Sequence, residues 1–239
     1  MNDRLAIRED ILGCTRCELS GKCRSPVPFF GPVPNRLAVL GEAPGEQEDL
    51  KGQPFIGPAG QLARKHMSQL GLDPEGFTWV NTVSCFPRGA PTEEHIKACA
   101  YHRERQLEAV APEFLLIYGQ VALQALRPDL QIKRGRGRPF LHGDIVCMAV
   151  YHPSAVLRRS LMEAPFREDL ERFVKMTEAG RNRWWEFVPD RCAWCPDFVD
   201  RFDPSGIGTC VTHLQKQERV RAAQLPPPPE QVEVGQLFH

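Results

Sequence analysis

The sequence has no long apolar segment and no net charge. None of its apolar runs approaches the roughly 20 residues that a membrane-spanning helix needs. Its first ten residues, MNDRLAIRED, carry charges where a signal peptide would have its apolar region. We therefore expect a cytoplasmic protein with no membrane partner, and we expect it to be a monomer.

The charged residues balance, with 30 basic and 30 acidic side chains among 239 residues. This balance removes the whole-chain argument for nucleic-acid binding, so any such function has to come from local clusters and a recognisable site. With 42% hydrophobic and 25% charged residues, the composition is that of a globular chain and excludes disordered, collagen-like and coiled-coil classes.

Cysteine is abundant, with nine residues. In a chain without an export signal, cysteines at this density are expected to be metal ligands rather than disulfide partners. The odd count agrees with that interpretation.

Apolar strands and amphipathic helices alternate along the first 180 residues. The pattern predicts strands at 37–40, 77–83, 114–118 and 145–150, and helices at 3–12, at 59–70, from Thr92, through Leu126 and at 165–176. Such alternation predicts a three-layer α/β domain with a mostly parallel four-stranded sheet. Reactive residues should lie just past the strand ends, where Gly41, Asn81, Gly119 and His152 occur.

The composition changes after Gly180. We expect a core domain over residues 1–180, a small appendage over 181–214, and a helix-like run, proline tether and tail over 215–239. The tether is Pro226 to Pro229, and four consecutive prolines enforce an extended polyproline segment.

The most informative motif is a glycine-rich loop with several carboxylates. It begins with GEAPGEQED at residues 41–49 and continues with GQPFIGPAGQL at 52–62. As a bare pattern it would fit an ordinary turn between a strand and a helix equally well. At its full length it closely resembles motif 1 of the family-four, iron–sulfur uracil-DNA glycosylases.

Two later segments are similar to the same family. They are VNTV at 80–83 and YHPSA at 151–155, which is followed by Leu157 and Arg158. The resemblance spans about residues 12–176, with the motifs in the family's order. It implies a uracil-DNA glycosylase-like fold and a DNA repair enzyme. Such an enzyme flips deoxyuridine out of single- or double-stranded DNA, hydrolyses the N-glycosidic bond and leaves an abasic site.

The residues of these motifs suit that chemistry. The carboxamide of Asn81 could read the hydrogen-bonding edge of uracil, and Phe55 could stack on its face. His152 could donate a hydrogen bond to uracil O2 as the departing base becomes negative. Glu42 and Glu48 share the role of positioning water and stabilising the sugar cation. Outside the motifs, a core phenylalanine and a structural histidine would be the ordinary interpretations.

Contacts to DNA are expected from two places. Leu157 or Val156 could fill the space that the flipped base leaves, with Arg158 beside them. A basic run without an acidic residue is a natural phosphate contact, or equally a solvated loop. This run contains Lys133, Arg134, Arg136 and Arg138.

A metal centre is expected from the thiols of Cys14, Cys17, Cys85 and Cys99. Their spacing suits either a [4Fe–4S] cluster or tetrahedral zinc. The resemblance implies the iron–sulfur cluster, with a structural role, since uracil excision needs no electron. Cys23 is a rival ligand, and Cys147, within an apolar strand, is expected to be a buried small hydrophobe.

The appendage suggests a second metal site. Three cysteines and a histidine have the spacing of a tetrahedral zinc site, although unliganded thiols are the alternative. These residues are Cys192, Cys195, Cys210 and His213. The terminal GQLF at 235–238 weakly resembles the peptides that dock on bacterial sliding clamps, and a frayed tail is the other interpretation.

Two rival functions remain open. The first is a DNA- or damage-binding protein on the same fold with weak or no catalysis. The second is a glycosylase with a shifted base preference, such as one for hypoxanthine. The triad of Glu42, Asn81 and His152 argues against a pure binding protein, which has no need of all three.

Overall fold

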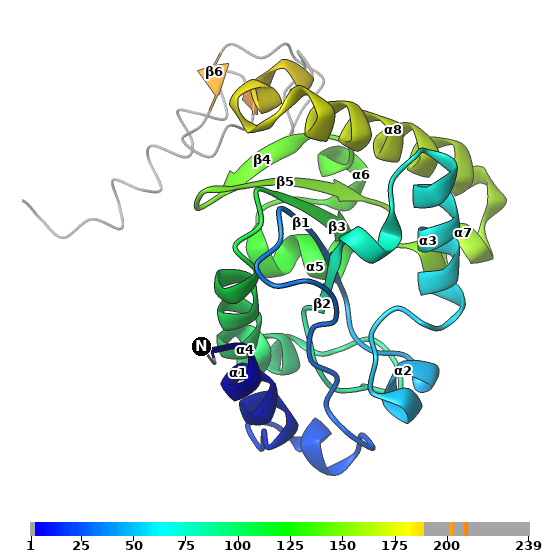
Figure 1. Cartoon of the computed structure of the whole chain (residues 1–239). Helices are drawn as coiled ribbons and strands as arrows, with labels where there is room; N and C mark the ends of the chain where they lie inside the picture. The colour runs from blue at the N-terminus through cyan, green and yellow to red at the C-terminus, as the bar shows by residue number, and fades with distance from the viewer. Residues whose placement is uncertain (1–2, 189–200, 203–207, 210–239) are drawn as a thin grey trace, which may run out of the picture.

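The computed structural model describes residues 3–188, 201–202 and 208–209 (Figure 1). Within these residues, none of the helices combines the length and apolar character needed to cross a membrane. Of the appendage expected over 181–214, the structure describes residues 181–188, 201–202 and 208–209, and the tail expected over 215–239 lies outside the described residues.

A five-stranded sheet forms the centre of the fold. Its strands are β1 (Leu37–Gly41), β2 (Thr78–Asn81), β3 (Phe114–Tyr118), β4 (Pro139–His142) and β5 (Ile145–Val150), in the order β2-β1-β3-β5-β4. The strands β2, β1, β3 and β5 run parallel, as the sequence predicts, and β4 pairs antiparallel with β5. The expectation of four strands was therefore one strand short.

Helices pack against both faces of this sheet. The helices of the described residues are α1 (Asp3–Leu12), α2 (Glu46–Lys51), α3 (Pro58–Gln69), α4 (Glu93–Val110), α5 (Gly119–Leu126), α6 (Ile132–Gly135), α7 (Pro153–Arg158) and α8 (Glu163–Ala179). Short 3-10 helices occur at Glu18–Gly21, Pro74–Gly76, Ser160–Met162 and Arg181–Phe187. A separate antiparallel pair is formed by β6 (Arg201–Phe202) and β7 (Gly208–Thr209).

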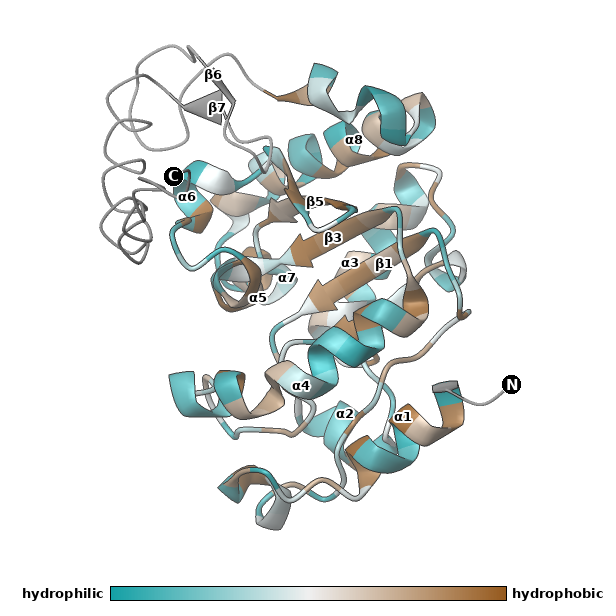
Figure 2. Cartoon of the chain, turned by 90° about the vertical axis from the view of Figure 1, so that its left-hand side faces the viewer, coloured by the Kyte–Doolittle hydropathy of each residue, from teal (hydrophilic) through white to brown (hydrophobic). Residues whose placement is uncertain are grey.

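Side-chain alternation along the strands divides the core into two halves. In β1, Ala38 and Leu40 join the half that contains residues of α1, α4 and α5, whereas Val39 joins the half formed with α3, α7 and α8. Every residue of β3 is buried, as expected of a strand covered on both faces, and Figure 2 shows the apolar colour of this strand. Cys147 of β5 is fully buried in the first half, which confirms the expectation for this cysteine.

The helix predicted to open at Thr92 does so. The Thr92 side-chain oxygen accepts a hydrogen bond from the backbone N–H of His95 (3.3 Å), and His95 Nδ1 accepts one from the backbone N–H of Thr92 (3.1 Å). This reciprocal capping satisfies two donors that a helix start leaves free. It fixes where α4 begins, and therefore where Cys99 lies on that helix.

The additional strand arises from a two-residue hairpin. His142 pairs with Ile145, so Gly143 and Asp144 form the turn, and Gly143 adopts a φ of 56°. Glycine followed by aspartate is a recognised hairpin turn. The strand itself is four residues long and begins with proline, which suits an edge position.

The end of α6 is tied to α8 by a partly buried ion pair. Arg136 Nε lies 2.7 Å from Asp169 Oδ2, and the Arg136 guanidinium also donates to the carbonyl oxygen of Pro165 (2.6 Å). Burial raises the pKa of Asp169 to about 6, and the neighbouring Arg136 opposes this rise. The pair therefore stabilises the charged carboxylate at neutral pH.

Replacing Arg136 tests this structural role. Arg136→Met should lower the free energy of unfolding at pH 8 by about 3 kcal/mol, because it leaves a buried carboxylate without its partner. The loss should be smaller at pH 5, where a carboxyl with a raised pKa is protonated and needs no cation. Denaturant unfolding at both pH values measures the effect.

The matched control is Arg167→Met, which removes an exposed ion pair with Glu171 (3.0 Å) on the same helix as Asp169. It should change the free energy of unfolding by less than about 0.5 kcal/mol. Equal small effects for both variants would show that Arg136 has no structural role.

Candidate functional site

A cavity of about 390 Å³ lies at the carboxyl ends of the parallel strands. This is the edge at which open α/β sheets bind ligands. The cavity is lined by Ala43, Gly45, Glu46, Gln47, Glu48, Phe55, Gly57, Pro58, Ala59, Gly60, Asn81, His152 and Ser154. Three predicted uracil-binding residues, Phe55, Asn81 and His152, therefore meet around one space.

The glycine-rich loop is held by the carboxylate of Glu48. One oxygen accepts a hydrogen bond from the backbone N–H of Gly45 (3.0 Å), and the other accepts one from the backbone N–H of Gly57 (2.7 Å). Glu48 is buried. Both of its oxygens are thus engaged in joining the two ends of the loop, a positioning role that the sequence did not separate from that of Glu42.

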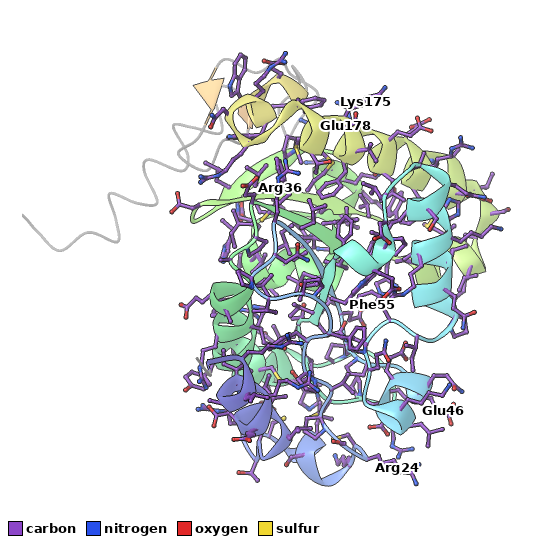
Figure 3. The ribbon with its side chains drawn as sticks, in the orientation of Figure 1. Arg24, Arg36, Glu46, Phe55, Lys175 and Glu178 are labelled. Atoms are coloured by element: carbon purple, nitrogen blue, oxygen red, sulfur yellow. The ribbon has the colours of Figure 1, made fainter. Side chains whose placement is uncertain are left out.

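Phe55 is the residue that this loop delivers to the cavity (Figure 3). Its φ of 58° lies in the left-handed region, which is strained for a bulky side chain. The ring lies 4.8 Å from that of Trp79 and 6.1 Å from that of Tyr118, so it is supported from behind by two aromatic side chains. A Cβ atom on Gly60 would overlap the carbonyl group of Phe55. Glycine is therefore required there.

Asn81 ends β2 with its side chain buried at the cavity. Its Oδ1 atom is buried and has no hydrogen-bond partner among the described residues. A Cβ atom on Gly41 would come within 2.6 Å of this oxygen and closer still to the ring of Phe55. An orphaned buried acceptor has a desolvation cost of about 1–3 kcal/mol, which a ligand that donates a hydrogen bond would remove.

His152 precedes α7 and is oriented by Ser154. Its Nδ1 atom lies 3.1 Å from the backbone nitrogen and 2.8 Å from the hydroxyl oxygen of Ser154. Because a backbone N–H can only donate, Nδ1 accepts, and the neutral ring carries its proton on Nε2. Burial, with a contribution from Arg158, lowers the pKa of His152 to about 4. The imidazole is therefore a neutral donor at physiological pH.

Ser154 lines the cavity and was not singled out from the sequence. The signal was present, because a side chain before a helix commonly accepts from the N–H two residues later. Gly119 is a second residue that positions His152. It has a φ of 90°, and a Cβ atom there would come within 2.9 Å of the His152 Cβ.

Glu42 and α7 lie near the cavity without lining it, apart from Ser154. Burial raises the pKa of Glu42, and the positive charge of Arg158 partly offsets that rise. Arg158 therefore acts on the pKa of both Glu42 and His152. Leu157 is 53% exposed whereas Val156 is buried, so only Leu157 of the two candidate wedge residues is free to meet DNA.

The predicted basic run does not reach the cavity. Lys133 and Arg134 lie in α6, Arg136 is bonded to Asp169, and Arg138 precedes β4. None of the four lines the space that holds Asn81 and His152. Their assignment as phosphate contacts stays a prediction, with Arg136 engaged inside the protein.

The cysteines of the predicted cluster gather beside α4. Buried Cys85 and Cys99 share a small core with Leu19 and Val83, and Cys17 and Cys23 pack against it. Burial raises the pKa of Cys99, and the nearby thiols of Cys17 and Cys14 raise it further. Five thiols therefore surround one site, with Cys23 as close a candidate as the sequence suggested.

Thiols are the donors that a [4Fe–4S] cluster takes. Within residues 3–188, no three cysteine, histidine or acidic side chains converge closely enough to hold a metal ion, so the cluster stays a prediction. Arg103 lies one helical turn after Cys99, and its Nη1 atom is buried without a partner. Its positive charge opposes the rise in the pKa of Cys99, so this donor suits the negative charge that thiolates bring to a cluster.

The predicted zinc ligands lie outside the described residues. These are Cys192, Cys195, Cys210 and His213. The same holds for the proline tether and the terminal GQLF, so the zinc site, the sliding-clamp contact and the domain boundaries stay predictions.

Comparison with known proteins agrees with the geometry. Residues 28–175 match the family model of the uracil DNA glycosylase superfamily. The chain is 32% identical over 181 residues to the type-4 uracil-DNA glycosylase of Archaeoglobus fulgidus, covering 71% of this chain and 91% of that protein. It is 32% identical over 180 residues to the type-4 enzyme of Thermotoga maritima, covering 71% and 93%. A type-5 uracil-DNA glycosylase of Thermus thermophilus is 29% identical over 175 residues, covering 59% and 79%.

The protonation of His152 can be tested directly. Nuclear magnetic resonance should find its ring neutral, with the proton on Nε2, from pH 8 down to about pH 5. Because the folded pKa lies below that of the unfolded chain, protonation should reduce stability as the pH falls from about 6.5 to 4. His152→Gln should lack this part of the acid sensitivity. A His152 titration near pH 6.5 would contradict the assignment.

Proposed function

Because the chain belongs to the type-4 uracil-DNA glycosylase family, within the uracil DNA glycosylase superfamily, we propose that it removes uracil from DNA. It flips deoxyuridine into the cavity, hydrolyses the N-glycosidic bond and leaves an abasic site. The observation that carries this proposal is the buried, unpartnered Oδ1 of Asn81 beside the ring of Phe55.

Base recognition follows from the carboxamide of Asn81. Its oxygen accepts a hydrogen bond from the N3–H of uracil, and its NH2 group donates one to O4. Cytosine presents the opposite pattern, so it leaves both groups of Asn81 buried without partners. The ring of Phe55, supported by Trp79 and Tyr118, stacks on the base.

Bond cleavage leaves negative charge on the departing base. The neutral imidazole of His152 donates its Nε2–H to uracil O2 and stabilises this anion without first protonating the base. The hydrogen bond from the backbone N–H of Ser154 to Nδ1 supports this role, because it keeps the ring proton on Nε2. The preorganised hydrogen bond costs no rearrangement during the reaction.

The sugar becomes positive as the bond breaks, and a water molecule then attacks C1′. We assign Glu42 to orienting this water and stabilising the cation, because the oxygens of Glu48 are already bonded to Gly45 and Gly57. The electron pair of the broken bond leaves with uracil, and the water proton passes to solvent or to Glu42. Glu48 acts as the residue that positions Phe55.

Leu157 and Arg158 approach the DNA. Leu157 is exposed directly after the His152 motif, which suits insertion into the stack that the base has left. Arg158 adds positive charge where the phosphates of a kinked strand would pass. Apart from buried Val156, these two are the sequence-predicted contacts nearest in sequence to a cavity residue, Ser154.

We further propose that Cys14, Cys17, Cys85 and Cys99 hold a [4Fe–4S] cluster. Cys17, Cys85 and Cys99 gather in one small core, and the thiol of Cys14 is near enough to affect the pKa of Cys99. The unpartnered Nη1 of Arg103 beside Cys99 supports the proposal further. When bound, the cluster supplies cross-linking rather than chemistry on the base. The four cysteines belong to the N-terminal segment, to α4 and to the segment that follows β2, and these are the parts that they would join.

Asn81→Asp tests the base-reading role. A carboxylate cannot donate to O4, so excision of uracil should fall by at least about 10- to 100-fold, the equivalent of about 1–3 kcal/mol. The assay incubates oligonucleotides that contain uracil, hypoxanthine or a thymine mispair and scores alkali-labile abasic sites. The parent should act on uracil.

The charge-matched control is Gln69→Glu, which changes an exposed amide at the end of α3. Its excision rate should equal that of the parent. An Asn81→Asp variant that folds and excises uracil at the parental rate would refute the assignment, and a parent protein that acts on none of the three oligonucleotides would refute the proposed function.

The cluster ligands can be separated from the rival thiol. Protein purified without oxygen should be brown, with broad absorbance in the visible blue, and should contain iron and sulfide. Single Cys→Ala changes at positions 14, 17, 85 and 99 should each lose iron, whereas Cys23→Ala should keep it. If Cys14→Ala keeps its iron and Cys23→Ala loses it, Cys23 is the ligand in place of Cys14. Protein that contains zinc and no iron would refute the cluster.

A further inference from the structure

A second cavity adjoins the first. It encloses about 400 Å³ and shares Glu46 and Gln47 of α2 with the cavity that contains Asn81. Its other walls come from two segments that are distant in sequence, around Lys22–Arg24 and Phe86–Arg88. We call this space the Lys22–Arg88 groove.

Three cations line the Lys22–Arg88 groove, namely Lys22, Arg24 and Arg88, all of them exposed. No ion pair joins the Arg24 guanidinium to any of the described carboxylates. Lys22 forms an ion pair with Glu18 (3.0 Å). Both side chains are exposed to solvent, so the pair is weak and Lys22 can bind another anion in place of Glu18. The groove therefore offers positive charge to an anion.

Two acids also line the groove. Asp49 is buried, and one of its oxygens accepts a hydrogen bond from the backbone N–H of Arg24 (2.9 Å), so it is used in holding that segment. Glu46 is exposed on the wall shared with the first cavity. Figure 3 shows Arg24 and Glu46 at the same end of the molecule, near α2. Among the exposed residues that line the groove, three cations thus face one acid, Glu46, while Glu18 pairs with Lys22 from outside the lining.

The segments that carry the cations are held together across the groove. The Arg88 guanidinium donates to the carbonyl oxygen of Lys22 (3.4 Å) and lies 5.8 Å from the centre of the Phe86 ring. Arg88 has a φ of 55°, a left-handed conformation that turns the chain at this point. Both segments also directly follow or contain cysteines of the small core, Cys23 and Cys85. The groove is thus built on the same scaffold as the predicted metal site.

We propose that the Lys22–Arg88 groove binds backbone phosphates of the DNA strand next to the flipped nucleotide. This inference rests on the proposed function, since it takes the occupant of the first cavity to be deoxyuridine. The wall between the cavities, α2, has six residues and a length of about 9 Å, a distance that neighbouring nucleotides of one strand can span. A strand that places uracil beside Asn81 can therefore reach the groove, where Lys and Arg provide the charge-assisted contacts that phosphates prefer.

A cluster held by Cys17 and Cys85 would fix both walls of the groove, and so would organise DNA binding without contacting DNA. The phosphate contacts of the groove come from residues other than the basic run at 133–138.

The test measures DNA binding separately from catalysis. Lys22→Ala, Arg24→Ala and Arg88→Ala are compared with the parent by fluorescence anisotropy. The probe is a single-stranded oligonucleotide that carries a tetrahydrofuran abasic analogue. Each variant should bind about tenfold more weakly at low salt, and the slope of log affinity against log salt should shrink by about 0.7 for each phosphate that the variant no longer neutralises.

The control is Lys175→Ala, an exposed lysine on α8 at the opposite end of the molecule (Figure 3). It should bind as the parent does, and Arg88→Lys, which keeps the charge, should recover most of the affinity. Iron content and thermal unfolding show whether each variant is folded.

The inference is overturned if the three alanine variants keep the parental affinity and salt slope, or if Lys175→Ala loses as much affinity as they do. The proposed function is judged separately, by uracil excision in the parent protein. If the parent excises uracil and the groove variants bind DNA as the parent does, the proposed function is supported and the phosphate-binding role of the groove is refuted.

Discussion

The arrangement of the site depends on the close approach at Gly41. This residue ends β1, and both the carboxamide of Asn81 and the ring of Phe55 come so near its Cα that no side chain fits. Phe55 reaches that position only because Glu48 bonds both ends of the glycine-rich loop. A strand end without a side chain thus allows two segments to meet, and the cavity is what remains between them and His152.

Among the described residues, polar side-chain atoms buried without partners are confined to two places. One is the cavity, where Asn81 Oδ1 has no hydrogen-bond donor. The other is on α4, shortly after Cys99 in sequence, where His102 and Arg103 have nitrogens without a partner. A core that is fully packed on both faces of the sheet tolerates these costs of about 1–3 kcal/mol each. In the cavity the missing partner would be a group that the chain does not itself supply, which agrees with a uracil site there. Arg103 lies beside Cys99, so its free nitrogen agrees with an anionic group at the cysteines.

Much of the fold was predictable from the sequence, because each parallel strand is a short apolar run between helical segments. The strands Phe114–Tyr118 and Ile145–Val150 and the helix Asp3–Leu12 have the predicted bounds. The strand β4 was missed because four residues that begin with proline carry too little periodicity. Its turn at Gly143 and Asp144 was the stronger signal. Short α2 was likewise read as part of a loop, since its start is stabilised by tertiary contacts of Glu48 rather than by an apolar face.

For the site, the sequence by itself determined which residue types stand at the strand ends, since Asn81 and His152 follow apolar runs directly. The tertiary structure decided which hydrogen bonds and ion pairs the candidate side chains form. Glu42 and Glu48 are six residues apart in one acidic loop, and only the folded chain brings the N–H of Gly57 to one of them. Arg136 belongs to a basic run in sequence, yet it pairs inside the protein with a carboxylate 33 residues further on. Such choices depend on which distant groups arrive within hydrogen-bond reach. A local pattern contains no information on that distance.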